Sequence, residues 1–456
     1  MMRIAGHARL LVTFSILAAC VLAPPRASMA EGRTPIRDTE IEATIQAFAT
    51  PLFTVADLTP EEVRIYIIKD ETLNAFVAGG QNLFLNTGLL METKNPAELI
   101  GVIAHEIGHI SGGHLVRTTG AIRNASNAAL LGLILGAATT LTTGRADIGV
   151  AVYQGTTGAG QAALLQYNRA QESSADHAAV RFLDATGQSS RGMHDFLETL
   201  SGEELLAPAR RSPYANTHPL TQDRINFVAS HAAQSPFAEA KTSAEFNARH
   251  SRMIAKLAGF LLSPARTFQR YPETDQSVPA RYARVIATFR EPSPKRALEL
   301  LNGLLGAFPE DGYFWELRGQ ILAESGQPLE ARVAYRKALT LLEAAPLVEA
   351  ELARAELAIN TNESNRAALE HMQSASWEMP NSAFAWRLLA TAQGRNDMLG
   401  MLALSLAEEA LLRNQLKNAV QQAKRARQSL KRGSPGWLRS LDIEELSKRR
   451  LKDRGR

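Results

Sequence analysis

Cysteine is nearly absent from this chain: among its 456 residues, only Cys20 carries a thiol. Cys20 lies in an N-terminal stretch that has the pattern of a secretory signal, so we expect the mature protein to contain no cysteine. A chain without cysteine has no disulfide, no thiolate ligand for a metal and no cysteine nucleophile. The composition therefore excludes the cysteine-protease class and a disulfide-stabilised fold.

The N-terminal signal is predicted to span residues 1–30. Basic residues precede an apolar run over residues 10–23, and small residues lead to a cleavage site after Ala30. The apolar run is shorter than the roughly 20 residues that a membrane-spanning helix needs. We therefore expect a soluble, exported protein. An alternative stays open, because residues 17–20 are similar to a bacterial lipobox, which would leave Cys20 as a lipid anchor.

The excess of one sign of charge is also small, with a formal net charge of only +4. Positive charge is nevertheless concentrated at the C-terminus. Lysine and arginine cluster at residues 424–427, 431–432 and 448–456. No nucleic-acid-binding motif accompanies these clusters, so we do not expect a nucleic-acid partner. A solvated tail or helix face is the simpler interpretation, and contact with anionic lipid or an acidic partner is the alternative.

The most informative motif in the chain is His105-Glu106-Ile107-Gly108-His109, which places two histidines and a glutamate within five residues. Positions i and i+4 of an α-helix lie on one face about one turn apart. Both imidazoles can therefore bind one ion, while Glu106 lies beside a water molecule that the ion polarises. The H-E-x-x-H arrangement is typical of zinc hydrolases.

The residues before the motif predict the helix that it requires. Asn95 is a suitable N-cap, Pro96 suits the first helical position, and Glu98 completes a capping box. Apolar residues over 99–104 then indicate a buried helix. Because burying polar groups without a partner is costly, a bound metal explains these side chains better than a solvated surface does.

A catalytic zinc ion takes three protein ligands, so a third must come from elsewhere in the chain. His114 is near, but on a straight helix it is turned about 140° from the ligand face, and only a helix break at Gly112-Gly113 could bring it back. The better candidate is Glu172, on a helix expected over residues 162–185 and capped by Gly187. Asp176 lies four residues further on the same face, where it can hold an imidazole by its free N–H. Two solvated acids on an amphipathic helix remain the alternative.

Five segments, taken together, resemble the gluzincin metallopeptidase family that includes HtpX and the CaaX prenyl endoproteases. The resemblance covers residues 40–260 and is nearest to the periplasmic, BepA-type members, which carry a C-terminal repeat domain and maintain β-barrel assembly in the outer membrane. The glycine pair lacks the proline that often precedes it in the family. The segments are Asn74-Ala75-Phe76 with Gly79-Gly80, Gly88-Leu89-Leu90, His105-Glu106-Ile107-Gly108-His109, Glu172-Ser173-Ser174-Ala175-Asp176 and Thr217-His218-Pro219.

The resemblance implies roles for five residues. It implies His105, His109 and Glu172 as ligands of one Zn²⁺ ion per chain, and Glu106 as the catalytic base. Asp176 would be a proton donor or the partner of a ligand. The implied location is the periplasm of a Gram-negative bacterium.

Two further residues are candidates to stabilise the oxyanion of the reaction, His218 and Arg224. Three interpretations of His218 stay open. It donates to the oxyanion, or it occupies the fourth zinc position as a latch, or it is an ordinary loop histidine. Substitution separates them, because activity should fall, rise or stay constant, respectively.

A short apolar run over Asn82, Leu83, Phe84 and Leu85 predicts a strand before the motif helix. As an edge strand beside the metal, it would hydrogen-bond an extended substrate peptide. A core hairpin strand is the alternative. Residues 124–144 carry no charge and are long enough for a membrane span, but glycines at 132 and 136 interrupt them. We expect a hydrophobic hairpin or flap over the site, with peripheral membrane contact, and keep a transmembrane segment as the alternative.

From residue 281 onward the chain repeats helical pairs. One unit fits the 34-residue tetratricopeptide pattern, in which small residues let paired helices approach and aromatic residues fill the gaps. We therefore predict a curved solenoid whose concave face binds peptides or partner proteins, with a generic helical bundle as the alternative. The residues of the fitting unit are Trp315, Gly319, Gly326, Ala331, Tyr335 and Ala338, and looser units lie near residues 297–309, 350–377, 383–412 and 416–430.

The predicted fold class is mainly α: a zincin-type metalloprotease domain with a small β-sheet, followed by an α-solenoid of tetratricopeptide-like repeats. The expected function is a secreted zinc endopeptidase that cleaves misfolded or stalled envelope proteins, using the repeats to bind them or the outer-membrane assembly machinery. A chaperone or assembly factor with a largely latent zinc site and an integral-membrane protease are the alternatives. The expected divisions are a signal at 1–30, a metallopeptidase domain at 31–262, a linker at 263–280, and repeats with a basic tail at 281–456.

Overall fold

The computed structural model describes residues 34–60, 62–78, 80–114, 168–204, 214 and 218–454. The predicted signal with Cys20, the uncharged segment 124–144 and the first turns of the helix expected from residue 162 lie outside the described residues. In the described part of the chain, every helix falls short of the length or the apolarity that crossing a bilayer requires.

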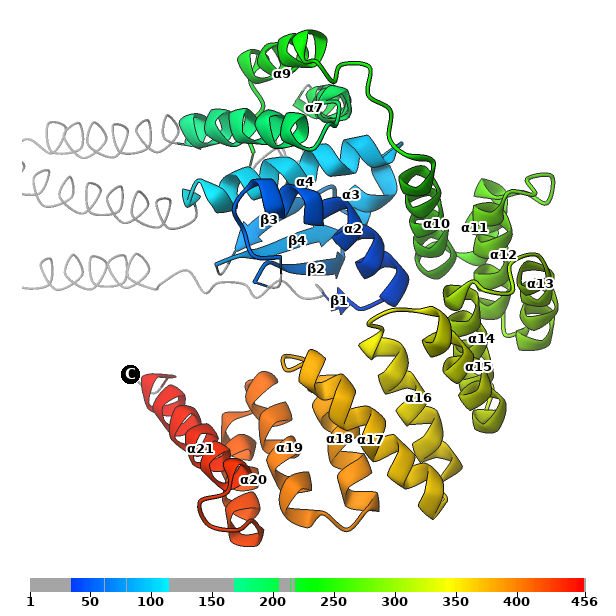
Figure 1. Cartoon of the computed structure of the whole chain (residues 1–456), viewed down its shortest axis with the longest axis vertical. Helices are drawn as coiled ribbons and strands as arrows, with labels where there is room; N and C mark the ends of the chain where they lie inside the picture. The colour runs from blue at the N-terminus through cyan, green and yellow to red at the C-terminus, as the bar shows by residue number, and fades with distance from the viewer. Residues whose placement is uncertain are drawn as a thin grey trace, which may run out of the picture.

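A four-stranded sheet forms the centre of the N-terminal half (Figure 1). Its strands are β1 (Thr34–Ile36), β2 (Arg64–Lys69), β3 (Ala75–Ala78) and β4 (Asn82–Asn86), in the order β1-β2-β4-β3. β2 and β4 are parallel, and the other two pairs are antiparallel. One face of β4 presents Leu83 and Leu85 to the core, and on the other face Phe84 stacks between two further rings, at 5.0 and 4.8 Å between centroids.

The expectation that Asn82, Leu83, Phe84 and Leu85 form an edge strand is wrong. β4 pairs with β2 on one side and with β3 on the other, so its backbone groups are already used. The hairpin alternative is the arrangement that the structure shows. The strand at that edge of the sheet is β3, which has β4 on one side and no other described strand on its second side.

Helices pack around the sheet to complete the N-terminal half. The sequence around α4 produces the predicted start: the side chain of Asn95 accepts from the Glu98 amide at 3.1 Å. The Glu98 carboxylate accepts from the Lys94 amide at 2.9 Å, one residue earlier than a capping box would use. The helices are α2 (Thr39–Val55), α3 (Thr87–Glu92), α4 (Pro96–Ser111), an unlabelled helix over 168–185, α7 (Arg191–Glu204), α9 (Gln222–Gln234) and α10 (Ala244–Leu261).

The C-terminal half is a stack of antiparallel helical pairs that curves around the β1 side of the sheet, as a tetratricopeptide-like solenoid does (Figure 1). In the unit with the strongest sequence match, a Cβ atom on Gly319 would lie 2.6 Å from the Tyr335 ring, so glycine permits the close approach. The predicted fold class is confirmed. The helices are α11 (Pro264–Arg270), α12 (Val278–Arg290), α13 (Pro294–Ala307), α14 (Gly312–Glu324), α15 (Pro328–Leu341), α16 (Pro346–Ile359), α17 (Asn362–Glu378), α18 (Ala383–Arg395), α19 (Leu399–Leu412), α20 (Leu416–Ser429) and α21 (Pro435–Arg454).

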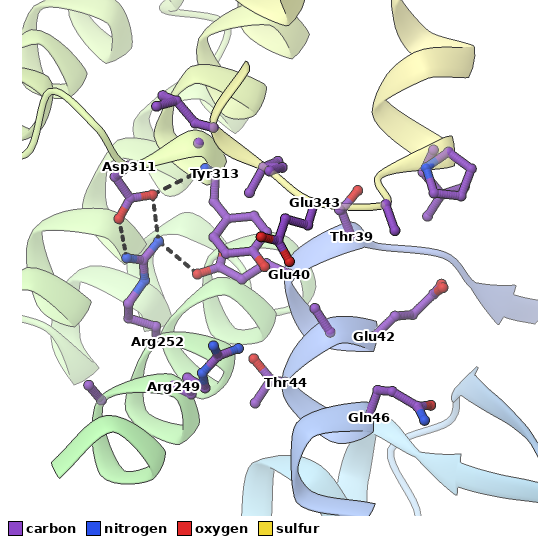
Figure 2. A pocket seen from close by; sticks show the side chains of 18 of the residues that line it. Thr39, Glu40, Glu42, Thr44, Gln46, Arg249, Arg252, Asp311, Tyr313 and Glu343 are labelled. Carbon is purple, nitrogen blue, oxygen red and sulfur yellow. Dashed lines mark hydrogen bonds and ion pairs between the residues drawn. The ribbon is translucent and has the colours of Figure 1, made fainter. Parts of the chain in front are cut away.

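A layer of charged side chains joins the two halves (Figure 2). Arg252 of α10 bonds to Glu40 of α2 at 2.7 Å and also to Asp311, at the start of α14. Lys256 bonds to Asp38 at 2.8 Å, and the Tyr282 hydroxyl of α12 donates to Glu40 at 2.9 Å. The stretch 263–280, expected as a linker, contains α11 and the start of α12, and α12 packs on α10. The two halves are therefore held by direct contacts as well as by the chain.

Candidate metal centre

Four buried side chains from three segments converge on one point: His105 and His109 of α4, Glu172 of the 168–185 helix, and His218. One ligand atom from each lies within 4.8 Å of the others. Since both helices are rigid and packed, the backbone places three of these groups without help from loops. The first three are the ligands that the family resemblance implies, and His218 is the fourth member of the cluster.

Gly108 explains how the two helices approach closely enough. A Cβ atom at this position would lie 2.7 Å from the backbone oxygen of Ala175, on the helix that carries Glu172. Any other residue would separate the helices. The glycine inside the motif is therefore a packing requirement of the site.

The spacing of the donor atoms fits a small tetrahedral divalent metal ion. With bonds of about 2.0–2.1 Å, the ligand atoms of such an ion lie about 3.3 Å apart. Nε2 of His105 is 3.1 Å from Nε2 of His109 and 3.3 Å from Nδ1 of His218. Glu172 presents Oε1 to His109 at 3.3 Å and Oε2 to His105 at 3.3 Å and to His218 at 3.2 Å. The residues present can hold a metal, with His218 at the fourth corner.

Glu106 supplies an independent sign of reactive chemistry. Its side chain is fully buried, and among the described residues neither carboxylate oxygen accepts a hydrogen bond. His218 Nε2 lies 3.5 Å from its Oε1. Because a buried carboxylate that accepts no hydrogen bond is destabilising, this arrangement indicates a group that binds a water molecule or a substrate.

His105 is held from behind by Asp176. Its Nδ1 atom lies 2.9 Å from Asp176 Oδ1, which leaves Nε2 facing the other donors. Burial lowers the pKa of His105, but hydrogen bonds with Asp176 and Glu172 outweigh it and raise the pKa to about 9. Burial raises the pKa of Asp176, but hydrogen bonds from Arg224 and His105 outweigh it and hold the pKa below its usual value. Both oxygens of Asp176 are thus engaged, by His105 and by Arg224, which is the arrangement expected of a partner to a metal ligand.

Burial likewise raises the pKa of Glu172, but the facing His218, with the rings of His105 and His109, holds that pKa well below its usual value. Glu172 therefore stays ionised, which is the form that binds a metal. A second group of metal-binding residue types, His194, Asp195 and Glu198, lies on α7 with its two carboxylates exposed, and it has no comparable enclosure.

Residues 35–232 match the family model described as Peptidase family M48. The chain contains a peptidase M48 domain. The beta-barrel assembly-enhancing protease of Yersinia pestis is 24% identical over 395 residues, which are 86% of this chain and 80% of that protein. The beta-barrel assembly-enhancing protease of Escherichia coli (strain K12) is 23% identical over 402 residues, 88% of this chain and 81% of that protein.

Among solved structures, the TPR domain of P58(IPK) is matched over 72% of this chain and 99% of its own, at 10% identity and a TM-score of 0.17. A score this low has no bearing on the fold. The description of the C-terminal half as a tetratricopeptide-like solenoid rests on the paired helices α12 to α21.

Arg224 of the M48 domain does not fit its expected role as an oxyanion donor. Its Nε and Nη2 atoms donate to Asp176 at 2.6 and 2.9 Å, and Nη1 donates to the Pro219 carbonyl at 2.9 Å and lies 3.0 Å from Glu172. All three nitrogens are engaged, and the side chain is buried. Arg224 therefore anchors the carboxylates behind the donor cluster, with each of its nitrogens directed at a protein acceptor.

Sequence reasoning missed Tyr214 in the M48 domain. Its buried ring stacks on His218 at 4.5 Å between centroids, and its carbonyl accepts from the His218 amide at 2.8 Å. The Tyr214 amide in turn donates to the Leu73 carbonyl, next to β3, at 3.3 Å. An aromatic residue four positions before the histidine was the available signal. Tyr214 thus fixes His218 over the cluster and ties it to the sheet.

Proposed function

We propose that this chain is a zinc-dependent endopeptidase of the periplasm that cleaves misfolded or stalled proteins of the envelope, with His105, His109 and Glu172 as the ligands. The observation that carries the proposal is the pairing of a tetrahedral donor set with Glu106, a buried carboxylate that has no hydrogen-bond partner among the described residues. A structural metal site needs no such carboxylate. The M48 match and the two protease relatives support the same class of reaction.

When bound, a zinc ion supplies a Lewis acid that lowers the pKa of a water molecule to about 7. Glu106 accepts the proton of the attacking water and delivers it to the leaving amine. Asp176 and Arg224 hold His105 and Glu172 in place through the transition. The substrate lies extended along β3, whose outer edge has no described strand beside it, so backbone groups bind it with little sequence preference.

The structure supports the latch interpretation of His218 over the other two. Its Nδ1 atom lies at the corner that an attacking water would need, 3.3 Å from His105 Nε2 and 3.2 Å from Glu172 Oε2. We propose that the segment holding His218 must move before a substrate reacts. His218→Ala should then raise peptidase activity, while a fall would point to oxyanion stabilisation.

The periplasmic location rests on the predicted signal at 1–30 and on the relatives' names, which refer to β-barrel assembly. We further propose a metallopeptidase unit over 31–262 and repeats from 281, with misassembled envelope proteins or the outer-membrane assembly machinery as partners of the repeats. A chaperone with a latent metal site is the second candidate, and the position of His218 favours it.

The deciding experiment compares Glu106→Gln with the unchanged protein on an unfolded protein substrate, with the metal content of both determined. We expect retained metal and at least a hundredfold slower cleavage, because general-base catalysis contributes about 10²–10⁴-fold. Equal cleavage by both proteins would remove Glu106 as the base. Activity absent from both, with holdase activity present, would favour the chaperone.

A further inference from the structure

The repeats contain an aromatic pocket that the peptidase chemistry does not use. Trp377, at the end of α17, is 87% exposed. Exposure of so large an apolar ring to water is unfavourable and marks an interaction site. With Pro380, Trp386 and Leu412 it lines a pocket of about 720 Å³ among the ends of α17, α18, α19 and α21. Trp386 is fixed there because its Nε1–H donates to the Pro380 carbonyl at 2.8 Å. One rigid and one exposed indole therefore face a common space.

The aromatic pocket also has positively charged residues in its lining. Arg439 and Arg450 of α21 line the pocket, against a single carboxylate, Glu408. Arg439 is bonded to Glu408 through two nitrogens, at 2.6 and 2.9 Å. Arg450 is exposed, lies in the basic end of the chain, and is left in excess. The pocket therefore suits an occupant that combines an apolar side chain with negative charge.

A hydrogen bond places the pocket next to the M48 domain. The side-chain amide of Asn381, which also lines the pocket, lies against the Arg64 guanidinium, and with the amide turned so that its oxygen faces Arg64 it accepts from Nη1 at 2.7 Å and Nη2 at 3.3 Å. Arg64 begins β2 and is in register with Asn82, which pairs with Ala78 at the end of β3. Through these two side chains the α17–α18 turn faces the end of the sheet where β2 begins and β3 ends.

We propose that this pocket is a docking site for an acidic segment of an extended polypeptide substrate, with an aromatic or large aliphatic side chain seated between Trp377 and Trp386. The Arg450 guanidinium meets the carboxylate of the segment, and the Asn381–Arg64 contact holds the docked chain beside the sheet. The proposal deepens the proposed function, on which it rests, by naming the class of segment that the repeats select.

The test measures fluorescence anisotropy of a labelled ten-residue peptide that contains one phenylalanine and two aspartates among serines. Full-length Glu106→Gln protein is used, so that binding is measured without cleavage. Trp377→Ala should weaken binding at least tenfold, because central aromatic residues dominate such interfaces. Leu329→Ala is the matched control, since Leu329 on α15 is 53% exposed and lies outside the pocket. It should leave binding within twofold.

Two variants of α21 test whether positive charge contributes to peptide binding. Arg450→Glu should weaken binding several-fold at low salt, and Arg449→Glu, an adjacent exposed arginine outside the pocket, should not. A peptide with lysines in place of the aspartates should bind less tightly, and one with serine in place of phenylalanine should lose most of its binding. Trp377→Ala protein that binds the acidic peptide as tightly as the parent protein overturns the proposal, as does a lysine peptide that binds equally well.

Self-association is a separate outcome. If sedimentation shows a dimer that Trp377→Ala converts to a monomer while peptide affinity stays constant, the pocket is a contact between copies and the proposal is wrong. The proposed peptidase function fails differently, through unchanged cleavage by Glu106→Gln, and peptide binding does not depend on that result. Trp377→Ala in the Glu106-intact protein should still cleave a short peptide that lacks the acidic segment.

Discussion

The Nδ1 atom of His114 lies 3.0 Å from the Nδ1 atom of His109. A histidine that binds a metal through Nε2 carries its proton on Nδ1, so a His109 that binds the metal would donate and His114 would accept. Although the helix geometry turned His114 away from the ligand face, the bend at Gly112-Gly113, where Gly113 has a φ of +62°, returns its ring to the back of His109. We infer that His114 positions His109, one of the proposed ligands.

The first prediction follows from this contact. His114→Ala should weaken metal binding about tenfold to a hundredfold, because the ring of His109 loses the acceptor that orients it. His114→Asn should restore most of the affinity, since its side-chain oxygen can lie near the position of Nδ1. Competition with a chelator measures both. Equal affinity in His114→Ala would show that the contact has no part in holding the metal.

Gly108 gives a second prediction. Gly108→Ala places a methyl group 2.7 Å from a backbone oxygen that cannot yield, so the helix with Glu172 must shift. We expect a loss of about 1–3 kcal/mol in the free energy of unfolding, together with loss of bound metal. The control is Gly306→Ala in α13, where no atom lies within 4 Å, and it should be neutral or stabilising by up to about 1 kcal/mol. Urea unfolding and metal analysis distinguish the two, and identical behaviour would contradict the packing argument.

The Arg224–Asp176 ion pair gives a third prediction, on stability. Arg224→Ala leaves two buried carboxylates, Asp176 and Glu172, without their cation. The free energy of unfolding should fall by about 3–5 kcal/mol, as for other broken buried pairs. Arg37→Ala removes an exposed arginine paired with Glu42 and should cost under about 1 kcal/mol. Comparable losses in both variants would mean that the Arg224 network contributes no more than a surface pair.

A pH dependence follows from His250. Burial lowers the pKa of its imidazole to about 4, and Nε2 lies 2.9 Å from the Thr93 hydroxyl. The unfolded chain, with a pKa near 6.5, takes up this proton first, so stability is present at pH 7 and is lost as pH falls between about 6.5 and 4. Between pH 7 and 5 the loss from this group is about 2 kcal/mol.

Urea unfolding of His250→Gln at both pH values measures the His250 contribution, because the variant should lose less stability than the parent protein over this interval. His177→Gln is the control, since His177 is exposed. An unchanged pH slope in His250→Gln would assign the effect to other groups.

Several features were accessible from sequence because they depend on local interactions. The cap at Asn95 and the i, i+4 spacing of His105 and His109 require only helix geometry, and α4 begins where they predicted. Glu172 and Asp176 share a helix face for the same reason. The position of β4 between β2 and β3 was out of reach, because strand order depends on long-range pairing that a five-residue apolar run does not encode.

The sequence by itself determined the donor types, their spacing on two helices and the presence of helical repeats, since each follows from residues within a few turns of one another. Only the tertiary structure decided that Arg224 faces Asp176 and not a substrate, that His218 closes the donor set under Tyr214, and that Asn381 brings the repeats against Arg64. These contacts join residues far apart in the chain, and their geometry depends on how whole helices pack.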